Sequence, residues 1–329
     1  MRKHVFPILA AALSVCMLFV LGAAYAAAET SAYIFSYDDM FTQRDLKQTA
    51  DLTDAVDYAV ADGQDIHITG AGVYVLTGTA KNVTVFVEAG EDDKVQLVLD
   101  DLTVVNSDAP VIYVKTADKV FVTTSGDSAL SVTGTFDGGD KADGVIYSKS
   151  DLVLNGSAVL TLSSTQNGVV GKDDLKITGG TYRITAKSKA VEANDSIRIA
   201  DGTLDLVAGT DGLHAENDDD DSLGYIYIAG GSIAIQAGDD AIHAVSAVQI
   251  NDGTISITAA EGSEATYIQI NGGTIRVTGS NSFDCDGTAQ YNGGTIIVNG
   301  QQLSAIPTQG MGGGRGGMGD WGSWGRRGG

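Results

Sequence analysis

Short runs in which apolar and polar residues alternate recur along most of the chain, and glycine-containing turns separate them. Alternation with a period of two is typical of β-strands that bury one face. In the C-terminal half, each turn is a Gly-Gly or Asp-Gly pair followed by Thr or Ser, and the second glycines lie 22, 29, 22, 20 and 21 residues apart. A period near 22 without helical spacing predicts a solenoid, in which each coil of chain stacks on the preceding one. The pairs are Gly179-Gly180, Asp201-Gly202, Gly230-Gly231, Asp252-Gly253, Gly272-Gly273 and Gly293-Gly294.

When the coils are aligned on these glycines, apolar side chains fall at the same two positions of every strand. Such repetition predicts parallel strands stacked around one continuous interior. We therefore predict an all-β fold, a single-stranded parallel β-helix of roughly ten coils between residues 66 and 300. The inward residues after the turns are Tyr182/Ile184, Leu204/Leu206, Ile233/Ile235, Ile255/Ile257, Ile275/Val277 and Ile296/Val298, and those before the turns are Leu175/Ile177, Ile197/Ile199, Ile226/Ile228, Val248/Ile250 and Ile268/Ile270.

Composition divides the rest of the chain into flanking segments. The predicted β-helix domain covers residues 66–305. Residues 29–65 are largely polar with weakly helical spacing, so we expect an N-terminal extension and a cap that seals the open end of the stack. Residues 306–329 are rich in glycine with scattered Trp and Arg, which predicts a flexible tail.

The beginning of the chain has the pattern of a secretory signal peptide. Basic residues precede an apolar run, and small residues follow it up to Ala28. A membrane anchor is the alternative, but the run ends at an A-x-A site, so we expect residues 1–28 to be removed and the protein to be secreted, extracellular or attached to the cell surface. Removal takes away Cys16 and leaves Cys285, which excludes an intrachain disulfide. The remainder has no apolar stretch long enough for a membrane span.

The chain is strongly acidic, with a formal net charge of −22 and a pI near 4.2. An acidic surface repels nucleic acid and anionic membranes, so neither is an expected partner. It also repels acidic polysaccharides unless cations bridge the two surfaces. No feature of the sequence indicates an oligomer, and we expect a monomer.

A second repeated motif lies at the corner between the two sets of strands. It consists of a small polar residue, Gly or Ala, an inward apolar residue, a variable outward residue and a small residue, as in Asp211-Gly-Leu-His-Ala215. The outward residue changes from apolar to ligand-type about halfway along the predicted stack. In chain order this column reads Ile146, Val170, Glu192, His214, His243, Glu264 and Asp286.

Carboxylates stacked at the spacing of neighbouring strands repel one another by about 3.5 kcal/mol at an effective dielectric constant of 20. Counter-ions would relieve this repulsion, and calcium is the hard cation that takes many oxygen ligands. We expect one or more Ca²⁺ ions between coils; a solvated acidic face is the alternative. The candidate ligands are some of Asp211, Glu216, Asp218, Asp239, Asp240, Glu264, Asp284 and Asp286.

His214 and His243 are expected on consecutive coils of the same column. Stacking of like residues explains them, and hydrogen bonding to a sugar or a transition-metal site with Glu192 and Glu264 are alternatives. The sequence contains no nucleophile elbow, zinc-protease motif or P-loop. Candidate carbohydrate-binding residues are His214, His243, Lys189 and Glu192.

Several strings of the sequence carry a resemblance to a known family. They include Ile68-Thr-Gly-Ala-Gly-Val-Tyr-Val-Leu-Thr-Gly78, Asp211-Gly-Leu-His-Ala-Glu-Asn217 and Asp239-Asp-Ala-Ile-His-Ala244. The chain resembles secreted bacterial proteins described as carbohydrate-binding domain-containing, which are right-handed parallel β-helices related to pectate and other polysaccharide lyases. The resemblance implies binding of cellulose or of acidic sugars such as polygalacturonate, with calcium held by the coils. The chain departs from the family pattern at Ser263 and Cys285.

Three functions remain open at this stage. The first is a non-catalytic extracellular module that binds polysaccharide through calcium on the acidic corner face. The second is a calcium-dependent polysaccharide lyase, for which Lys189 is the candidate base. A surface lysine paired with the acidic column is the simpler interpretation of Lys189. The third is a cell-surface adhesin or scaffold whose C-terminal tail contacts the cell wall.

Overall fold

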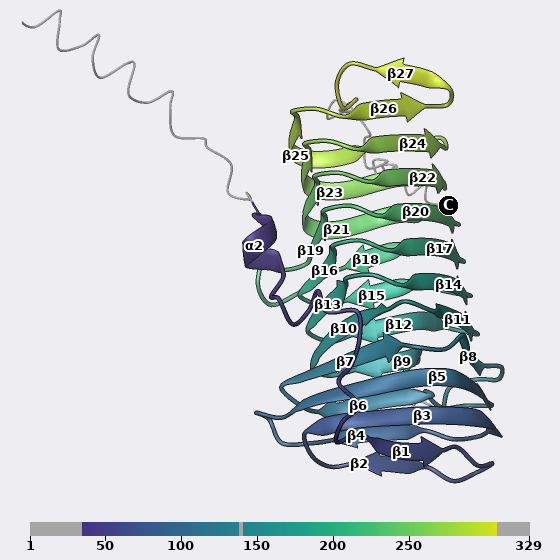
Figure 1. The fold of residues 1–329 in the computed structure, drawn as a ribbon. Helices are drawn as coiled ribbons and strands as arrows, with labels where there is room; N and C mark the ends of the chain where they lie inside the picture. Colours follow the sequence, from purple (N-terminus) through teal and green to yellow (C-terminus); the bar gives the residue numbers. More distant parts are fainter. Residues whose placement is uncertain (1–34, 138–140, 308–329) are drawn as a thin grey trace, which may run out of the picture. The chain divides into compact units, whose positions relative to one another are not determined.

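The computed structural model describes residues 35–137 and 141–307, and the chain divides into two units, Met1–Ser36 and Tyr37–Gly329. The second unit is a parallel β-solenoid of about 11 turns with almost no helix (Figure 1). This confirms the predicted fold class. The predicted signal peptide lies outside the described residues, as does the C-terminal tail beyond residue 307.

Each coil contributes strands to three parallel faces, which we name the turn face, the corner face and the strap face. The turn face contains β8 (Ser128–Val132), β11 (Val159–Ser164), β14 (Thr181–Ala186), β17 (Thr203–Ala208), β20 (Ser232–Ala237), β22 (Thr254–Thr258), β24 (Thr274–Thr278) and β26 (Thr295–Val298), with the second parts of β3 (Gly72–Lys81) and β5 (Lys94–Asn106).

The other two faces share the long strands β21 (Asp240–Ile250), β23 (Glu261–Ile270) and β25 (Asp284–Tyr291), which bend between them. The corner face contains β2 (Ile66–Ile68), β4 (Val85–Glu88), β6 (Ile112–Thr116), β9 (Gly144–Ser148), β12 (Asn167–Gly171), β15 (Val191–Ala193), β18 (Leu213–Ala215) and the first parts of the long strands. The strap face contains β1 (Val56–Ala59), the first parts of β3 and β5, β7 (Lys119–Thr124), β10 (Asp151–Gly156), β13 (Asp174–Ile177), β16 (Ser196–Ile199), β19 (Tyr225–Ile228) and the second parts of the long strands.

The register follows the alignment on the glycine pairs. Leu204 of β17 pairs with Ile233 of β20, which pairs with Ile255 of β22, and all three side chains are buried. Apolar side chains that point inward from all three faces form one continuous core along the stack. Stacked identical positions therefore supply the hydrophobic stabilisation that a single coil could not provide.

The glycine of each turn meets two requirements at once. Gly253 has a φ of +111°, and a Cβ atom there would lie 3.0 Å from the carbonyl oxygen of Gly231 in the coil below. A side chain would therefore be strained by the backbone conformation and crowded by the neighbouring coil. This explains why glycine recurs with the period of the solenoid.

Only the last part of the predicted N-terminal extension and cap lies at the open end of the stack, where β1 is the terminal strand and Tyr58 and Val60 pack against the core. Helix α2 (Tyr37–Met40) and the following chain to residue 55, which we call the strap, run along the side of the solenoid and cross the strap face (Figure 1). The Phe41 ring lies 6.0 Å from that of Tyr227, and the Arg44 guanidinium lies 4.8 Å above the Phe121 ring. The strap is non-helical beyond Met40, and the predicted extension also contains the first strand, β1.

Polar contacts attach the strap to three successive coils. The Gln48 amide donates to the Thr178 carbonyl at 3.0 Å and accepts from the Gly156 N–H at 3.0 Å. The Asp45 carboxylate lies 3.1 Å from Lys176 Nζ and 3.7 Å from Lys119 Nζ. The strap thereby covers outward residues of the strap face that would otherwise be exposed, and this is the physical reason why it lies there rather than over the open end.

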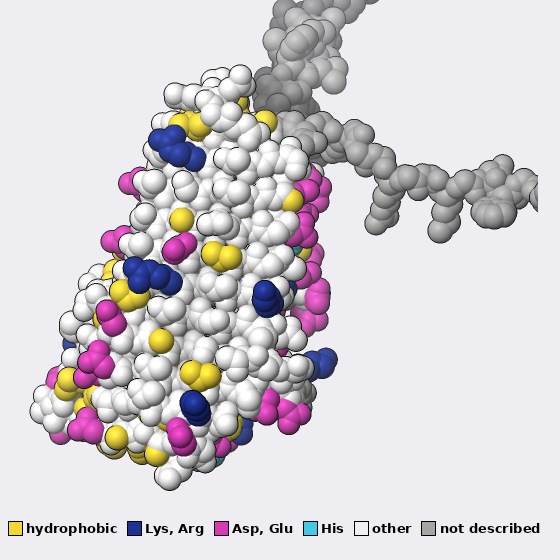
Figure 2. Space-filling model, turned by 90° about the vertical axis from the view of Figure 1, so that its right-hand side faces the viewer, with side chains coloured by type: hydrophobic (Ala, Val, Ile, Leu, Met, Phe, Trp, Pro, Cys, Tyr) yellow, Lys and Arg dark blue, Asp and Glu magenta, His cyan; other side chains and the backbone are white. Residues whose placement is uncertain are grey.

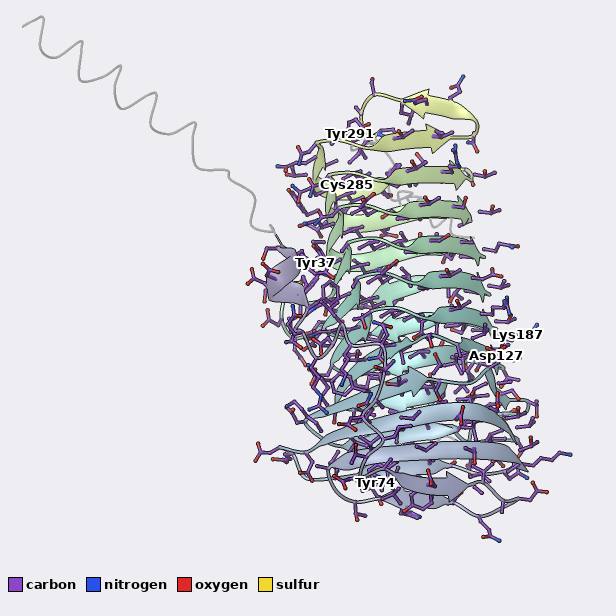
Figure 3. All side chains as sticks on the ribbon, in the orientation of Figure 1. Tyr37, Tyr74, Asp127, Lys187, Cys285 and Tyr291 are labelled. Atoms are coloured by element: carbon purple, nitrogen blue, oxygen red, sulfur yellow. The ribbon has the colours of Figure 1, made fainter. Side chains whose placement is uncertain are left out.

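The C-terminal end of the solenoid closes differently. Strand β27 (Gln301–Leu303) pairs antiparallel with β26, and Ile306 is buried against the core. The described chain is therefore still packed at Ile306, where the sequence analysis began the tail. Figure 3 shows Cys285 and Tyr291 on β25 near this end and Tyr37 on the strap.

Within residues 35–137 and 141–307, we find no helix whose length and apolar character would let it cross a membrane.

Candidate functional site

The central part of the predicted outward column lies on consecutive strands of the corner face. Val170 pairs with Glu192, Glu192 with His214, His214 with His243, and His243 with Glu264. Each pairing is parallel, so these side chains form one row along the solenoid. We call Glu192, His214, His243 and Glu264, with the carboxylates beside them, the acidic file. Figure 2 shows a row of acidic side chains at the right-hand edge of the molecule and others spread down the opposite side.

Both ends of the predicted column were wrong by one or two residues. At the N-terminal side Val170 pairs with Tyr147, because Ile146 points inward and packs in the core. At the C-terminal side Glu264 pairs with Asp284, and Asp286 is exposed outside the column. The large Phe283 side chain is buried in the core where the sequence alignment had placed Cys285, and this shifts the register by two.

The two histidines stack in the middle of this file. Their ring centroids are 4.7 Å apart with an interplanar angle of 11°. His214 Nδ1 lies 3.0 Å from an Asp211 oxygen and Nε2 lies 3.0 Å from a Glu216 oxygen. Burial opposes ionisation of Asp211, but the hydrogen bond and charge of His214 outweigh it, so the pKa of Asp211 is lowered.

His243 is held by carboxylates from its own coil and the next one. Its Nδ1 lies 3.3 Å from an Asp240 oxygen and 3.5 Å from a Glu264 oxygen. The hydrogen bond with Asp240 raises the pKa of His243 against the effect of burial, and Glu264 adds to the rise. Burial and the nearby Asp240 carboxylate raise the pKa of Glu264, although His243 opposes this rise. Contacts among these residues therefore shift the pKa values of Asp211, His243 and Glu264.

Three carboxylates meet where two coils enter the corner face. Asp211 precedes β18, and Asp239 and Asp240 lie where β21 begins; one oxygen of each lies within 4.8 Å of the others. Asp240 is 7% exposed, and its buried Oδ1 has no hydrogen-bond partner. An ionised oxygen without a partner is costly to bury. A cation among these oxygens would supply the missing interaction, and all three donors are of the type that calcium prefers.

A second group shares Asp240 and adds His243 and Glu264, with ligand atoms within 4.8 Å of one another. One nitrogen and two oxygens suit a transition metal better than the all-oxygen set does. The two groups are contiguous because residues 239–243 belong to one turn of chain. The two groups are therefore adjacent candidate positions for a cation, one with oxygen ligands alone and one with a nitrogen ligand.

The other predicted ligands lie apart from these groups. Glu216 is engaged by His214, and Asp218 is exposed in the loop that follows. Asp284 lies one rung above Glu264, but neither it nor Asp286 belongs to a group of three close ligand atoms within the described residues. Of the predicted ligands, Asp211, Asp239, Asp240 and Glu264 belong to the two groups, and His243 is the nitrogen-bearing member of the second group.

Lys189 and Glu192 belong to a polar cluster one coil below His214. Glu192 oxygens lie 3.6 Å from Lys189 Nζ and 3.1 Å from Lys172 Nζ, and one accepts a hydrogen bond from Asn167 at 3.0 Å. Burial, with the adjacent Glu192, raises the pKa of Asp143, which also lies in this cluster. Lys189 is therefore an ion-pair partner of the acidic file.

The structure also reveals an aromatic half of the same column that sequence reasoning missed. His67 pairs with Phe86, Phe86 with Tyr113, and Tyr113 with Tyr147, directly below Val170. Their rings are in contact, from the stacked His67–Phe86 pair at 5.0 Å to the edge-on Tyr113–Tyr147 pair at 5.5 Å. The signal was an aromatic residue between β-branched ones, as in Val85-Phe-Val87 and Ile112-Tyr-Val114.

The solenoid of this chain is similar in fold to a polysaccharide lyase-like protein. A solved structure described as the polysaccharide lyase-like protein from C. thermocellum, gadolinium derivative, matches with a TM-score of 0.61 and 27% sequence identity, and the match covers 72% of this chain and 98% of that one. The resemblance seen in the sequence is thus confirmed at the level of the fold.

The family follows from the sequence match. The model of the carbohydrate-binding domain-containing protein family matches residues 62–305, and the chain belongs to this family. A curated relative with the same description from Acetivibrio thermocellus is 33% identical over 140 residues. That alignment covers 40% of this chain and 49% of the relative, so it spans about half of the relative's length.

Proposed function

We propose that this protein is an extracellular, calcium-dependent module that binds acidic polysaccharide through the corner face. Membership of a carbohydrate-binding family supports the general function. The observation that carries the finer proposal is the cluster of Asp211, Asp239 and Asp240, together with a buried Asp240 oxygen that has no hydrogen-bond partner. The N-terminal sequence pattern supports export.

In this proposal Asp211, Asp239 and Asp240 hold the ion. When bound, calcium supplies positive charge and vacant coordination positions that carboxylate or hydroxyl oxygens of a sugar can fill. Without it, a chain of net charge −22 repels a polyuronate. The structural relative is a gadolinium derivative, and gadolinium, like calcium, is a hard cation that prefers oxygen ligands.

The geometry favours binding over lyase catalysis. Lys189, the candidate base, lies 3.6 Å from a Glu192 oxygen, so its amine is engaged in an ion pair within the corner face. Of the two histidines, His243 is the one placed to donate a hydrogen bond to a bound sugar, since its side chain is 23% exposed and its carboxylate neighbours raise its pKa.

Titration calorimetry with polygalacturonate and with calcium tests the proposal. We expect binding of polygalacturonate in calcium and loss of it in EDTA. Asp240→Asn keeps the shape of the side chain and removes its charge, so we expect calcium affinity to fall about tenfold or more, equivalent to about 1.4 kcal/mol. Asp205→Asn, at an exposed position on the turn face, is the matched control.

Polygalacturonate binding that is unchanged by EDTA, or calcium affinity that is equal in the Asp240 and Asp205 variants, would contradict the proposal.

A further inference from the structure

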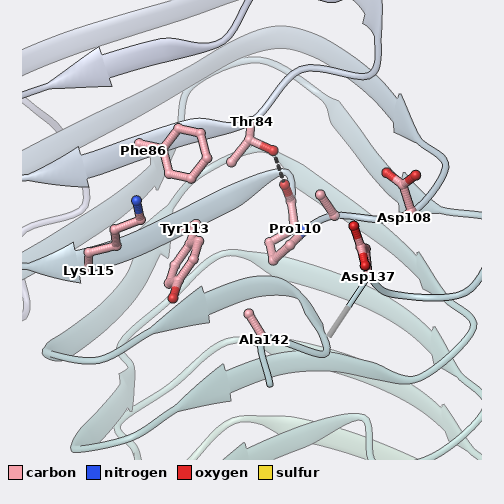
Figure 4. Close-up of a pocket in the computed structure, with 9 residues that line it drawn as sticks. Thr84, Phe86, Asp108, Pro110, Tyr113, Lys115, Asp137 and Ala142 are labelled. Atoms are coloured by element: carbon pink, nitrogen blue, oxygen red, sulfur yellow. Dashed lines mark hydrogen bonds between the residues drawn. The ribbon is translucent and has the colours of Figure 1, made fainter. Parts of the chain in front are cut away.

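Lysines compensate the carboxylates of the corner face in the coils that precede the histidines. Beside a cavity of about 490 Å³ in the N-terminal half of the column, Lys115 Nζ lies 2.8 Å from a Glu88 oxygen and 4.5 Å from the centre of the Phe86 ring (Figure 4). Nearer the histidines, Glu192 forms ion pairs with two lysines at 3.1 and 3.6 Å. The chain therefore supplies its own cations for this part of the face.

Two carboxylates beside His243 have no such lysine. Within the part of the chain that the structure describes, Asp240 and Glu264 form ion pairs with His243 and with no Lys or Arg. The two carboxyl groups also contact each other, and Asp240 Oδ1 is buried without a hydrogen-bond donor. Two touching anions with a single imidazole between them leave negative charge uncompensated, and such charge is costly to bury. The group therefore needs a further cation.

The spacing of the ligand atoms distinguishes His243 from His214. Each ring nitrogen of His214 lies 3.0 Å from a carboxylate oxygen, so that ring is already engaged. His243 Nδ1 lies farther from its neighbours, at 3.3 Å from an Asp240 oxygen and 3.5 Å from a Glu264 oxygen, whereas charge-assisted hydrogen bonds are about 2.7–2.9 Å long. Around a zinc ion with bonds of about 2.0–2.1 Å, tetrahedral geometry places neighbouring donors about 3.3 Å apart. The distances from His243 Nδ1 are close to that spacing.

We propose that Asp240, His243 and Glu264 form a site for a divalent transition-metal ion such as Zn²⁺, and that the ion joins β21 to β23. An imidazole nitrogen with two carboxylates suits zinc and its neighbours in the first transition series, whereas calcium prefers oxygen ligands alone. The proposed calcium position uses Asp211 and Asp239 instead and shares only Asp240 with this site.

The exposure of the three ligands indicates how the ion is reached. Asp240 is buried, whereas the His243 side chain is 23% exposed and the Glu264 side chain 41% exposed. The ion is then held from its inner side, and its remaining coordination positions face solvent, where water or an anionic oxygen can fill them. The site does not depend on the proposed function.

Calorimetric titration of untagged, metal-free protein with Zn²⁺ in a large excess of calcium tests the site, and visible absorption with Co²⁺ reports its ligands. We expect Zn²⁺ to bind despite the calcium, because the nitrogen ligand favours it. His243→Asn and Glu264→Gln should each lower the zinc affinity at least tenfold. His67→Asn, a change of the same residue type at the other end of the column, is the matched control and should leave it unchanged. Asp239→Asn should lower the calcium affinity alone.

The site is overturned if Zn²⁺ does not bind, if excess calcium displaces it, or if His243→Asn and His67→Asn lower the zinc affinity equally. Glu264 is partly exposed, so Glu264→Gln decides the matter if His243→Asn fails to fold, and an unchanged zinc affinity in that variant also overturns the site. Loss of calcium-dependent polygalacturonate binding with zinc binding intact would contradict the proposed function and not this site.

Discussion

The ion pair between the strap and the solenoid provides the sharpest test of how this fold is held together. The Asp45 side chain is 1% exposed and lies between two lysines of the strap face, 3.1 Å from Lys176 Nζ. Asp45→Asn keeps the volume and an acceptor for the Thr42 N–H, which now donates to the carboxylate at 3.0 Å. The substitution therefore removes charge alone and leaves the buried Lys176 ammonium without its anion.

Removal of one partner of a buried pair costs about 3–5 kcal/mol, and we expect the lower end because Asn still accepts hydrogen bonds. Urea denaturation measures the loss, and hydrogen exchange of the strap and of β13 locates it. Asp54→Asn, an exposed change in the same segment, should have little effect. Addition of Lys176→Met to Asp45→Asn should restore stability, because it removes the unpaired buried charge.

The same pair predicts a dependence on pH. Burial opposes ionisation of Asp45, but the Thr42 N–H and the two lysines outweigh it, so its pKa is lowered in the folded protein. A lowered folded pKa contributes stability above the unfolded value of about 4, and this contribution is lost as pH falls through the folded pKa. Asp45→Asn should lack this acid-dependent part. A loss below about 1 kcal/mol at neutral pH, or no rescue by Lys176→Met, would refute the reasoning.

Two further predictions concern the turns and the question of catalysis. Gly253→Ala should destabilise the protein by about 1–3 kcal/mol because of its positive φ and the coil beneath it, whereas Gly70→Ala, with open space around it, should be neutral or stabilising by up to about 1 kcal/mol in the same urea titration. Pectate incubated with the protein and calcium should show no rise in absorbance from unsaturated product; a rise that Lys189→Ala abolishes would establish the lyase instead.

The sequence specified the register of the middle coils well, because glycine pairs mark the same point of each coil and apolar residues follow at fixed offsets. The alignment failed in two coils. The coil that contains Tyr147 follows a longer connection after β8, and the coil that contains Phe283 places an aromatic residue inward where a smaller one was expected. A slip of one residue, as at Tyr147, exchanges the inward and outward residues, whereas a slip of two, as at Phe283, keeps the face but puts the wrong residue at each position.

The position of the strap and the aromatic half of the outward column could not be predicted from the glycine repeat. The strap has no repeat, and its contacts join residues more than 100 positions apart, such as Gln48 with Gly156 and Thr178. A local clue existed in the outward Phe121 and Tyr227, which the strap buries. The acidic part of the site was easier to predict from the sequence, because carboxylates and histidines occupy positions that are apolar in the preceding coils.

The strap changes how the stack should come apart. In an ordinary solenoid each coil touches only its neighbours, so the array can fray from either end one winding at a time. Here a single segment is anchored on β7, β10, β13 and β19. We therefore expect those coils to unfold together. The middle of the molecule then forms one cooperative unit, to which the outer coils are added.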